Sequence, residues 1–313
     1  MAGVEVRANV ALAEYTRFGL GGAARWLVES WNKDAFLEAM AIAHASSEPS
    51  VVLGGGTNLI VADQGFPGIV LRYRASGITK SNGSVSVEAG ADLQALVDFA
   101  IEQGLAGLHT MTRIPGWVGA ALYGNAGAYG HSINEFVTRV EYAEGSHVRL
   151  LSNRECQFAY RESIFKKCKG WIILAAELTM PEGPPEDLRR RAAEIQSIRD
   201  AKYPPTMRCA GSIFKNCLLA QLPASAASVL PEKIIIEDKV PSAWFLEQVG
   251  AKGMRRGDIQ VAHYHANLLY NDGVGTSADV HALIDELKHR VMDSFGFELE
   301  EEVQYVGFPD RDV

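Results

Sequence analysis

The stretch 113–130 holds the residue types in this chain that are best suited to bind an anionic ligand. It has five glycines and four alanines, interleaved with large apolar residues such as Trp117 and Leu122, so it differs from a polar flexible linker. Glycine tolerates positive φ and lets the backbone approach a ligand closely, and a run of exposed backbone N–H groups makes an anion-binding concavity. The composition predicts either a cradle for the pyrophosphate of a cofactor or a buried helix packed closely on a sheet.

Another glycine-rich turn lies earlier in the chain, in 51–62. There the pattern predicts a buried strand, a tight turn with Thr57 and Asn58, and a further apolar strand. Two such turns can hold the two ends of one extended anionic ligand. Neither has the spacing of a P-loop. One G-x-G-x-x-A match occurs at 19–24, but 14–18 is a poor buried strand, so we do not expect a Rossmann turn there.

Seven motifs, in the same order along the chain, resemble those of the UDP-N-acetylenolpyruvoylglucosamine reductase (MurB) family. They are found at 15–22, 53–58, 114–119 with 125–130, 160–163, 211–216, 265–267 and 299–303. The resemblance implies an α/β and α+β chain. A two-lobed FAD-binding module of the vanillyl-alcohol-oxidase type would span 1–195, with lobes at about 1–72 and 73–195. A smaller α+β substrate-binding domain would span 196–313.

The same resemblance implies an NADPH-dependent FAD enzyme of peptidoglycan precursor synthesis. It would reduce UDP-N-acetylglucosamine enolpyruvate to UDP-N-acetylmuramate, with FAD bound non-covalently and NADPH as co-substrate. The alternatives are another FAD-dependent sugar or alcohol oxidoreductase on the same fold, or a catalytically inactive flavoprotein that binds a nucleotide sugar.

Three residues are the catalytic candidates that the resemblance implies. Ser212, which by position alone suits a turn or cap, would deliver a proton to the substrate. Arg161, otherwise a surface arginine paired with Glu155 or Glu162, would bind the substrate carboxylate or enolate. Glu302 would be the catalytic glutamate.

Glu302 lies in a run of three glutamates that otherwise suits a solvated acidic cluster. Glu301 stands where the family pattern has proline, and Val303 fixes the register.

The resemblance also assigns binding residues. The cofactor-binding candidates are Leu53, Gly54, Gly55, Gly56, Thr57, Asn58, Arg113, Ile114, Pro115, Gly116, Gly119, Asn125, Gly127, Ala128 and Tyr129. The substrate-binding candidates are Arg199, Lys202, Lys215, Asn216, His265 and Asn267. Arg199 and Lys202 are three apart, so one helix face can present both to a diphosphate, which Lys215 and Asn216 could also bind. The alternative for this pair is a solvated basic face.

The totals exclude several other classes. The 313 residues suffice for two domains, and 47% hydrophobic with 22% charged residues is typical of a globular enzyme. The net charge of −8 disfavours nucleic acid or a membrane surface as partner. No apolar run is long enough to span a membrane, and no signal-peptide pattern begins the chain. We therefore expect a cytoplasmic monomer.

Metal and thiol chemistry are not expected. His263 and His265 lack an evident third ligand, so we predict no metal site. The four cysteines form no C-x-x-C pair, which indicates reduced thiols. Cys209 and Cys217 flank the serine motif without a base partner, so inert packing is expected.

Periodicity predicts the elements that position these residues. Helices are expected at 34–45, 92–103, 186–202, 241–248 and 276–294, and strands at 85–89, 137–143, 147–151, 171–180, 266–271 and 297–306. Residues 1–16 are predicted to be an arm that leads into a first strand. The connection 181–185 is too short for the substrate lid that one class of the family inserts there, so we expect a lidless member. The irregular stretch 218–240 is expected to replace that lid in part, or to be a surface excursion.

Overall fold

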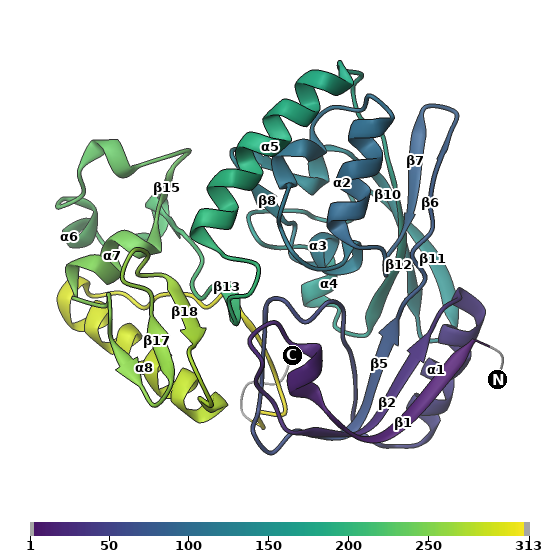
Figure 1. Cartoon of the computed structure of the whole chain (residues 1–313), viewed down its shortest axis with the longest axis horizontal. Helices are drawn as coiled ribbons and strands as arrows, with labels where there is room; N and C mark the ends of the chain where they lie inside the picture. Colours follow the sequence, from purple (N-terminus) through teal and green to yellow (C-terminus); the bar gives the residue numbers. More distant parts are fainter. Residues whose placement is uncertain (1–2, 310–313) are drawn as a thin grey trace. The chain divides into compact units, whose positions relative to one another are not determined.

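A computed structural model describes residues 3–309 and divides the chain into two compact units (Figure 1). The first unit comprises 1–10, 24–56 and 67–204, and the second comprises 11–23, 57–66 and 205–313. The second unit therefore takes two short segments from the N-terminal part of the chain. The functional division expected at 195/196 stays a prediction.

One sheet of the first unit contains the N-terminal strands. Its order is β1-β2-β5-β3, and β3 pairs in parallel with β5. These strands are β1 (Val4–Ala11), β2 (Ala23–Ser30), β5 (Phe66–Tyr73) and β3 (Ser50–Val52). The arm expected at 1–16 is wrong over the described residues, because Val4–Ala11 form strand β1, in which Val4, Val6, Ala8 and Val10 alternate with other residues as in an edge strand. Residues 1 and 2 lie outside the described residues.

The predicted helix at 34–45 is confirmed as α1 (Lys33–Ala45). The Asn32 side chain accepts a hydrogen bond from the Ala35 amide at 2.9 Å, which satisfies a donor in the first turn. Phe36 is buried, and its ring centroid lies 5.0 Å from that of Tyr73 on β5. This contact packs the helix onto the sheet.

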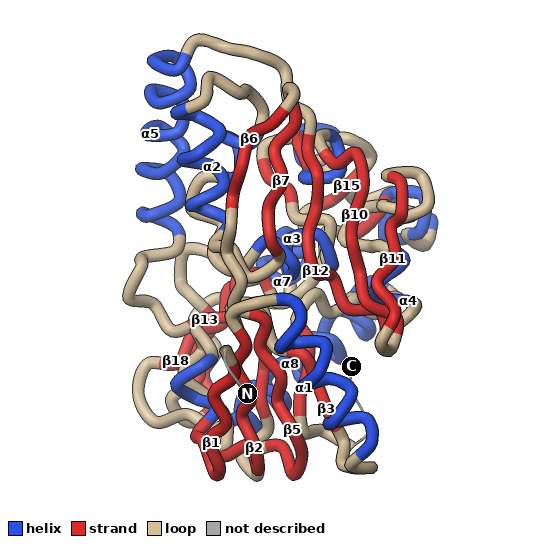
Figure 2. Tube along the Cα trace, turned by 90° about the vertical axis from the view of Figure 1, so that its right-hand side faces the viewer, coloured by secondary structure: helices blue, strands red, loops and turns tan. Residues whose placement is uncertain are grey.

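The other large sheet of the first unit is antiparallel, with the order β11-β10-β12-β7-β6 (Figure 2). Its strands are β6 (Ile78–Ser81), β7 (Ser84–Glu88), β10 (Val137–Glu144), β11 (His147–Ser152) and β12 (Trp171–Leu178). Four of these five were predicted from the sequence, and the structure confirms them.

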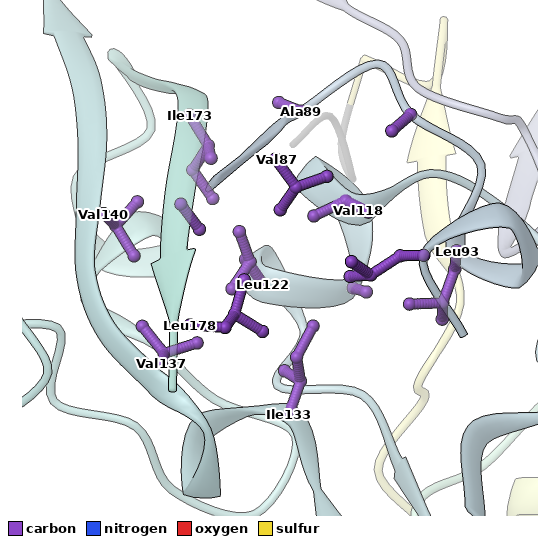
Figure 3. Packing of buried hydrophobic residues seen from close by; sticks show 14 of the residues in the cluster. Val87, Ala89, Leu93, Val118, Leu122, Ile133, Val137, Val140, Ile173 and Leu178 are labelled. Atoms are coloured by element: carbon purple, nitrogen blue, oxygen red, sulfur yellow. The ribbon is translucent and has the colours of Figure 1, made fainter. Parts of the chain in front are cut away.

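Helices cover this antiparallel sheet. They are α2 (Leu93–Glu102), α3 (Val118–Tyr123), α4 (Ile164–Lys167) and α5 (Pro185–Lys202), with the 3₁₀ turns η2 (Leu108–Met111) and η3 (Ile133–Glu135) and the small hairpin β8 (Gly127–Ala128) and β9 (His131–Ser132). Val118 and Leu122 of α3 lie among the buried side chains of β7 and β12 (Figure 3). Only residues 179–184 connect β12 to α5, as the sequence predicted.

The second unit contains a four-stranded sheet with the order β13-β18-β17-β16. Its strands are β13 (Cys209–Ser212), β16 (Arg255–Arg256), β17 (Ile259–Val261) and β18 (Leu268–Asn271). The helices are α6 (Ala224–Ala227), α7 (Ser242–Gln248) and α8 (Ser277–Phe295), with 3₁₀ turns η1 (Leu12–Tyr15), η4 (Leu219–Gln221) and η5 (Glu232–Ile234). The predicted helices 241–248 and 276–294 are confirmed, and the second ends at Gly296 with φ +73°.

Two further strand pairs complete the second unit. One is β14 (Cys217–Leu218) with β15 (Lys239–Val240), and the other is β4 (Leu59–Val61) with β19 (Gln304–Val306). The strand predicted at 297–306 is therefore shorter than expected. Residues 19–24 lead into strand β2 rather than a helix, which excludes a Rossmann turn there. Within residues 3–309, no helix is long and apolar enough to cross a membrane.

Candidate functional site

In chain order, the first glycine-rich turn is 53–56 and the second is 113–117. The first presents a run of backbone amides. The Leu53 amide donates to Leu71 at 2.9 Å, which is the last bond of the β3 edge. Within residues 3–309, the amides of Gly54, Gly55 and Gly56 donate to no other group of the chain. Gly56 has φ +63°, which favours glycine. Three consecutive unpaired N–H groups match the anion-binding concavity expected from the sequence.

The second glycine-rich turn packs directly against the first. A Cβ placed on Gly55 would lie 2.9 Å from the Cα of Gly116, so any side chain there would force the turns apart. Gly116 itself has φ +106°. The sequence therefore places glycine where two backbones meet, and both turns belong to the first unit.

Arg113 begins this second turn in an unusual conformation, with φ +64°. Its amide donates to the Gln94 side chain at 2.7 Å. Its guanidinium makes two bonds to Asp200 of α5, each 2.9 Å. These hydrogen bonds raise the pKa of Arg113 and lower the pKa of the Asp200 carboxyl. The fork-like pairing ties the turn to the C-terminal turn of α5.

The structure confirms one of the two readings of 113–130, the closely packed helix, for part of the stretch. Residues 118–123 are helix α3, and a Cβ on Gly119 would lie 2.9 Å from Ala89, so that glycine serves helix–strand packing. For the turns that flank α3, the reading as a cofactor cradle stays a prediction. Asn125 has φ +43°, and its side chain donates to Ala159 at 2.8 Å.

The predicted catalytic arginine contacts one cofactor-binding candidate of the first unit, Gly127. Arg161 has φ +57°, and its guanidinium donates to the Gly127 carbonyl at 3.2 Å. Lys166 donates to the Arg161 carbonyl at 2.6 Å. Glu155 accepts from Ser152, and Glu162 accepts from Lys166, so both alternative partners of the arginine take part in other bonds.

Arg199 and Lys202 lie in the last turn of α5, as predicted. The guanidinium carbon of Arg199 lies 5.4 Å from the Tyr203 ring centroid, and the Lys202 ammonium lies 5.3 Å from it. Both cations therefore gather at the C-terminal end of α5. Their contact with a substrate stays a prediction.

In the second unit, a short antiparallel pairing places Ser212 near Glu302. Ser212 ends β13, after Gly211 with φ +75°. The Glu302 amide then donates to Ile213 at 2.7 Å, and the Lys215 amide donates to Glu300 at 2.9 Å. Two of the three catalytic candidates are thus brought to one strand pairing.

Lys215 and Glu301 are held within the second unit. Lys215 is buried, and its ammonium pairs with the Glu300 carboxylate. Glu301, which departs from the family pattern, accepts from Lys288 of α8 at 3.0 Å and from the Tyr305 hydroxyl. Its carboxylate is therefore bound on the α8 side.

Asn58 and Asn267 support this pairing from two directions. The Asn58 side chain donates to the Glu302 carbonyl at 3.0 Å. The buried Asn267 accepts from the Phe214 amide at 2.9 Å and donates to the Phe214 carbonyl at 2.8 Å. It also donates to Ser242 at 2.7 Å, so its carboxamide braces the segment after Ser212. Contact of the substrate with Asn267 stays a prediction. The same holds for His265, two residues before Asn267, and for Asn216, two residues after Phe214.

The residues present fit a flavin adenine dinucleotide. The unpaired amides of Gly54, Gly55 and Gly56 suit a pyrophosphate. Because the second turn approaches Gly55 so closely that a side chain has no room there, no side chain of these three residues covers the amides. In the described part of the chain, no group of three or more histidine, cysteine or acidic side chains is arranged to hold a metal ion.

Sequence reasoning missed several residues that shape these turns. Arg72 contacts both glycine-rich turns, and Gln94 and Asp200 bind Arg113. Arg72 and its partner Glu29 lie in apolar strand patterns and match none of the motifs. The sequence signal is limited to a charged residue next to apolar residues in each strand.

Comparisons with known proteins agree with these features. Residues 25–150 match the model of an FAD binding domain, and residues 203–306 match the C-terminal domain of UDP-N-acetylenolpyruvoylglucosamine reductase. The chain is 55% identical to the UDP-N-acetylenolpyruvoylglucosamine reductase of Solibacter usitatus, over 96% of this chain and 97% of that protein. It is 35% identical to that of Rubrobacter xylanophilus, over 95% and 94%.

A solved structure agrees as well. The crystal structure of the reductase (MurB) from Thermus caldophilus matches with a TM-score of 0.75 and 30% identity, and covers 97% of this chain and 99% of that one. The predicted fold class, an FAD-binding module followed by a smaller α+β domain, is confirmed. The chain belongs to the UDP-N-acetylenolpyruvoylglucosamine reductase family.

Proposed function

We propose that this protein is an FAD-containing, NADPH-dependent enzyme that reduces UDP-N-acetylglucosamine enolpyruvate to UDP-N-acetylmuramate. The product is a precursor of peptidoglycan. The observation that carries the proposal is the 55% identity to a reductase of that name over 96% of the chain. The similarity extends through both the FAD-binding model and the C-terminal domain model.

The proposed chemistry divides between the cofactor and the chain. When bound, FAD supplies hydride transfer from NADPH to the enol ether. Arg161 stabilises the negative charge that develops on the substrate carboxylate, because a guanidinium fork suits a planar anion. Glu302 joins Arg161 in stabilising the enolate-like charge that develops on the substrate, and Ser212 gives a proton to the carbon that carries it. A neutral hydroxyl can act as the acid if it lies within hydrogen-bond reach.

Binding of the nucleotide sugar is proposed for two groups of residues. Arg199 and Lys202, gathered around Tyr203, would bind the diphosphate. Lys215 and Asn216 are proposed for the diphosphate as well, and His265 for another part of the substrate. Asn267 holds Phe214, so its contribution includes positioning of the Ser212 segment.

We also propose that the enzyme acts as a monomer in the cytoplasm, without nucleic-acid or membrane partners. Four free cysteines are consistent with a reducing compartment. The net charge of −8 disfavours polyanionic surfaces.

One experiment tests the proposal against its rivals. Purified yellow protein should oxidise NADPH at an appreciable rate only when the enol ether is added. Rapid turnover with oxygen and a sugar or alcohol would indicate an oxidase, and nucleotide-sugar binding without turnover would indicate an inactive flavoprotein.

Heat or acid should release the flavin, because the turn 53–58 has no histidine or cysteine for a covalent link. Flavin that stays with the denatured chain would contradict non-covalent binding.

A further inference from the structure

A buried carboxylate of the first unit gathers three arginines behind the cofactor turns. Glu29 on β2 is 3% exposed. Its Oε1 accepts from Arg72 at 2.9 Å and from Arg74 at 3.0 Å, and its Oε2 accepts from Arg7. A buried charge requires such partners, because an unpaired carboxylate in the interior is strongly unfavourable. Arg7 also pairs with Glu5 at 3.2 Å, so the buried carboxylate of Glu29 lies within a network of charged side chains.

Arg72 reaches from this cluster to both glycine-rich turns. It is 7% exposed, and its Nη2 donates to the Gly54 carbonyl at 3.3 Å. Its guanidinium carbon lies 4.7 Å from the ring centroid of Trp117, in the second turn. A guanidinium stacked on an indole is attracted to the ring face. A single side chain therefore contacts the first turn through a hydrogen bond and the second through an aromatic face.

The bond to Gly54 has a geometric consequence for the neighbouring amide. The peptide unit is planar and trans, so the carbonyl of Gly54 and the N–H of Gly55 point in opposite directions. Because Arg72 holds that carbonyl on its own side, the Gly55 N–H faces away from Arg72. Gly55 is the middle one of the three unpaired amides.

We propose that Arg72 is a positioning residue for the cofactor pyrophosphate, with Glu29 holding its guanidinium in place. Arg72 fixes the plane of the Gly54–Gly55 peptide so that the Gly55 amide is presented to the anion. It also holds Trp117, and with it the second turn, against the first. This inference rests on the proposed function, since it requires that the chain bind FAD.

Arg72→Lys is the principal test. Lysine keeps the charge beside Glu29 but lacks the planar fork that bonds Gly54 and stacks on Trp117. We expect the Kd for FAD, measured by flavin fluorescence on apoprotein, to rise about tenfold, the combined loss of one hydrogen bond and one cation–π contact. Arg25→Lys is the matched control, because Arg25 pairs with Glu48 at the surface of the same sheet. Its Kd should equal that of the wild type.

Thermal unfolding separates positioning from general stability. The Tm gained on adding FAD should shrink in Arg72→Lys relative to the wild type. If the apoprotein Tm falls but the gain from FAD is unchanged, Arg72 is a stabilising residue only and the inference is wrong. A Kd equal to that of the wild type would show that charge alone suffices, which also overturns it.

Trp117→Leu keeps the inference testable if the arginine variant does not fold. This change removes the aromatic face and leaves the Arg72–Glu29 pair intact. We expect a severalfold rise in the Kd for FAD. Trp117→Leu also removes the more distant contact of Arg74, whose guanidinium carbon lies 5.8 Å from the same ring centroid. Where Arg72→Lys folds, the two effects in the double variant should be less than additive, because both changes remove the Arg72–Trp117 contact. Full additivity would contradict the shared role. A wild-type protein that bound no FAD would refute the proposed function itself.

Discussion

The backbone N–H of Glu302 donates to the carbonyl of Ile213 at 2.7 Å, so the residue after Ser212 is the hydrogen-bonded neighbour of the predicted catalytic glutamate. The pairing is extended by the Lys215 amide, which donates to Glu300 at 2.9 Å. Asn267 binds both backbone groups of Phe214 between them. The backbone positions of Ser212 and Glu302 relative to each other thus depend on backbone hydrogen bonds, which side-chain substitutions leave in place.

Replacement of Ser212 by alanine should therefore slow one half-reaction without disturbing the fold. Reduction of the flavin by NADPH needs no proton donor to carbon, so its rate should be unchanged. Reoxidation by the enol ether should slow by about 100-fold or more, as for loss of a general acid. Stopped-flow absorbance of the flavin measures both. Ser294→Ala, at an exposed position of α8, is the control, and equal damage to both half-reactions would make Ser212 structural.

Arg161→Lys should also act on the second half-reaction. Lysine keeps a positive charge but cannot make two parallel bonds to a carboxylate. Loss of one donor to developing charge costs on the order of 3 kcal/mol, or about 100-fold in rate. Lys169→Arg, a surface change in the same unit, is the control. An unchanged reoxidation rate with a normal FAD content would remove Arg161 from the catalytic set.

His109 gives the stability of the first unit a defined dependence on pH. Burial, and then the charge of Arg191, lower its pKa below the ordinary value of 6.5. Its Nδ1 accepts from the Gly107 amide at 3.2 Å, which requires that nitrogen to be unprotonated. As the pH falls through about 6.5, the unfolded chain takes up a proton that the folded chain resists, so stability falls below that pH.

The pH effect can be isolated with one substitution. In His109→Gln the side-chain oxygen can still accept from Gly107, but it does not titrate. The decrease in Tm between pH 7.5 and 5.0 should therefore be smaller in this variant than in the wild type. His147→Gln, at an exposed position, should behave like the wild type. Parallel pH profiles for all three proteins would contradict a role for His109.

The stretch 218–240 forms an excursion closed by the β14–β15 pair. Ala226 is 1% exposed, and Leu222 and Leu230 pack against the core of the second unit. We predict that the segment contributes to nucleotide-sugar binding. Replacing 220–238 by a tight glycine-containing turn should raise the KM for the enol ether about tenfold, or about 1.4 kcal/mol. Flavin reduction by NADPH, which does not involve the sugar, is the internal control. An unchanged KM in a folded, FAD-loaded variant would mean that the segment is surface decoration.

Elements specified by neighbouring residues were predictable from the sequence. Asn32 begins α1, and the box of Thr276 with Asp279 begins α8, because the cap and the amides it binds lie within one turn. The glycine-rich turns were likewise found from local composition. Their function, in contrast, came from the order of seven motifs and not from any one of them.

Features that depend on distant partners were not predictable. Arg113 pairs with Asp200 and Arg72 pairs with Glu29, and neither partner lies in the same local pattern. The strand expected over 297–306 shortens to Gln304–Val306, because 300–302 pairs with 213–215 instead. A single sequence carries no signal for such pairings, since they are set by tertiary packing.

The parallel pairing of β4 with β19 joins Leu59 to Gln304, near opposite ends of the chain. A ribosome releases the chain from its N-terminus, so β4 emerges long before its partner strand is made. All three residues of β4 are buried in the finished molecule. Until the last residues appear, this apolar strand has an open edge, which is a site for association with other nascent chains. The second unit can thus finish folding only after residues 304–306 have been synthesised. Chains that stop before residue 304 are expected to aggregate.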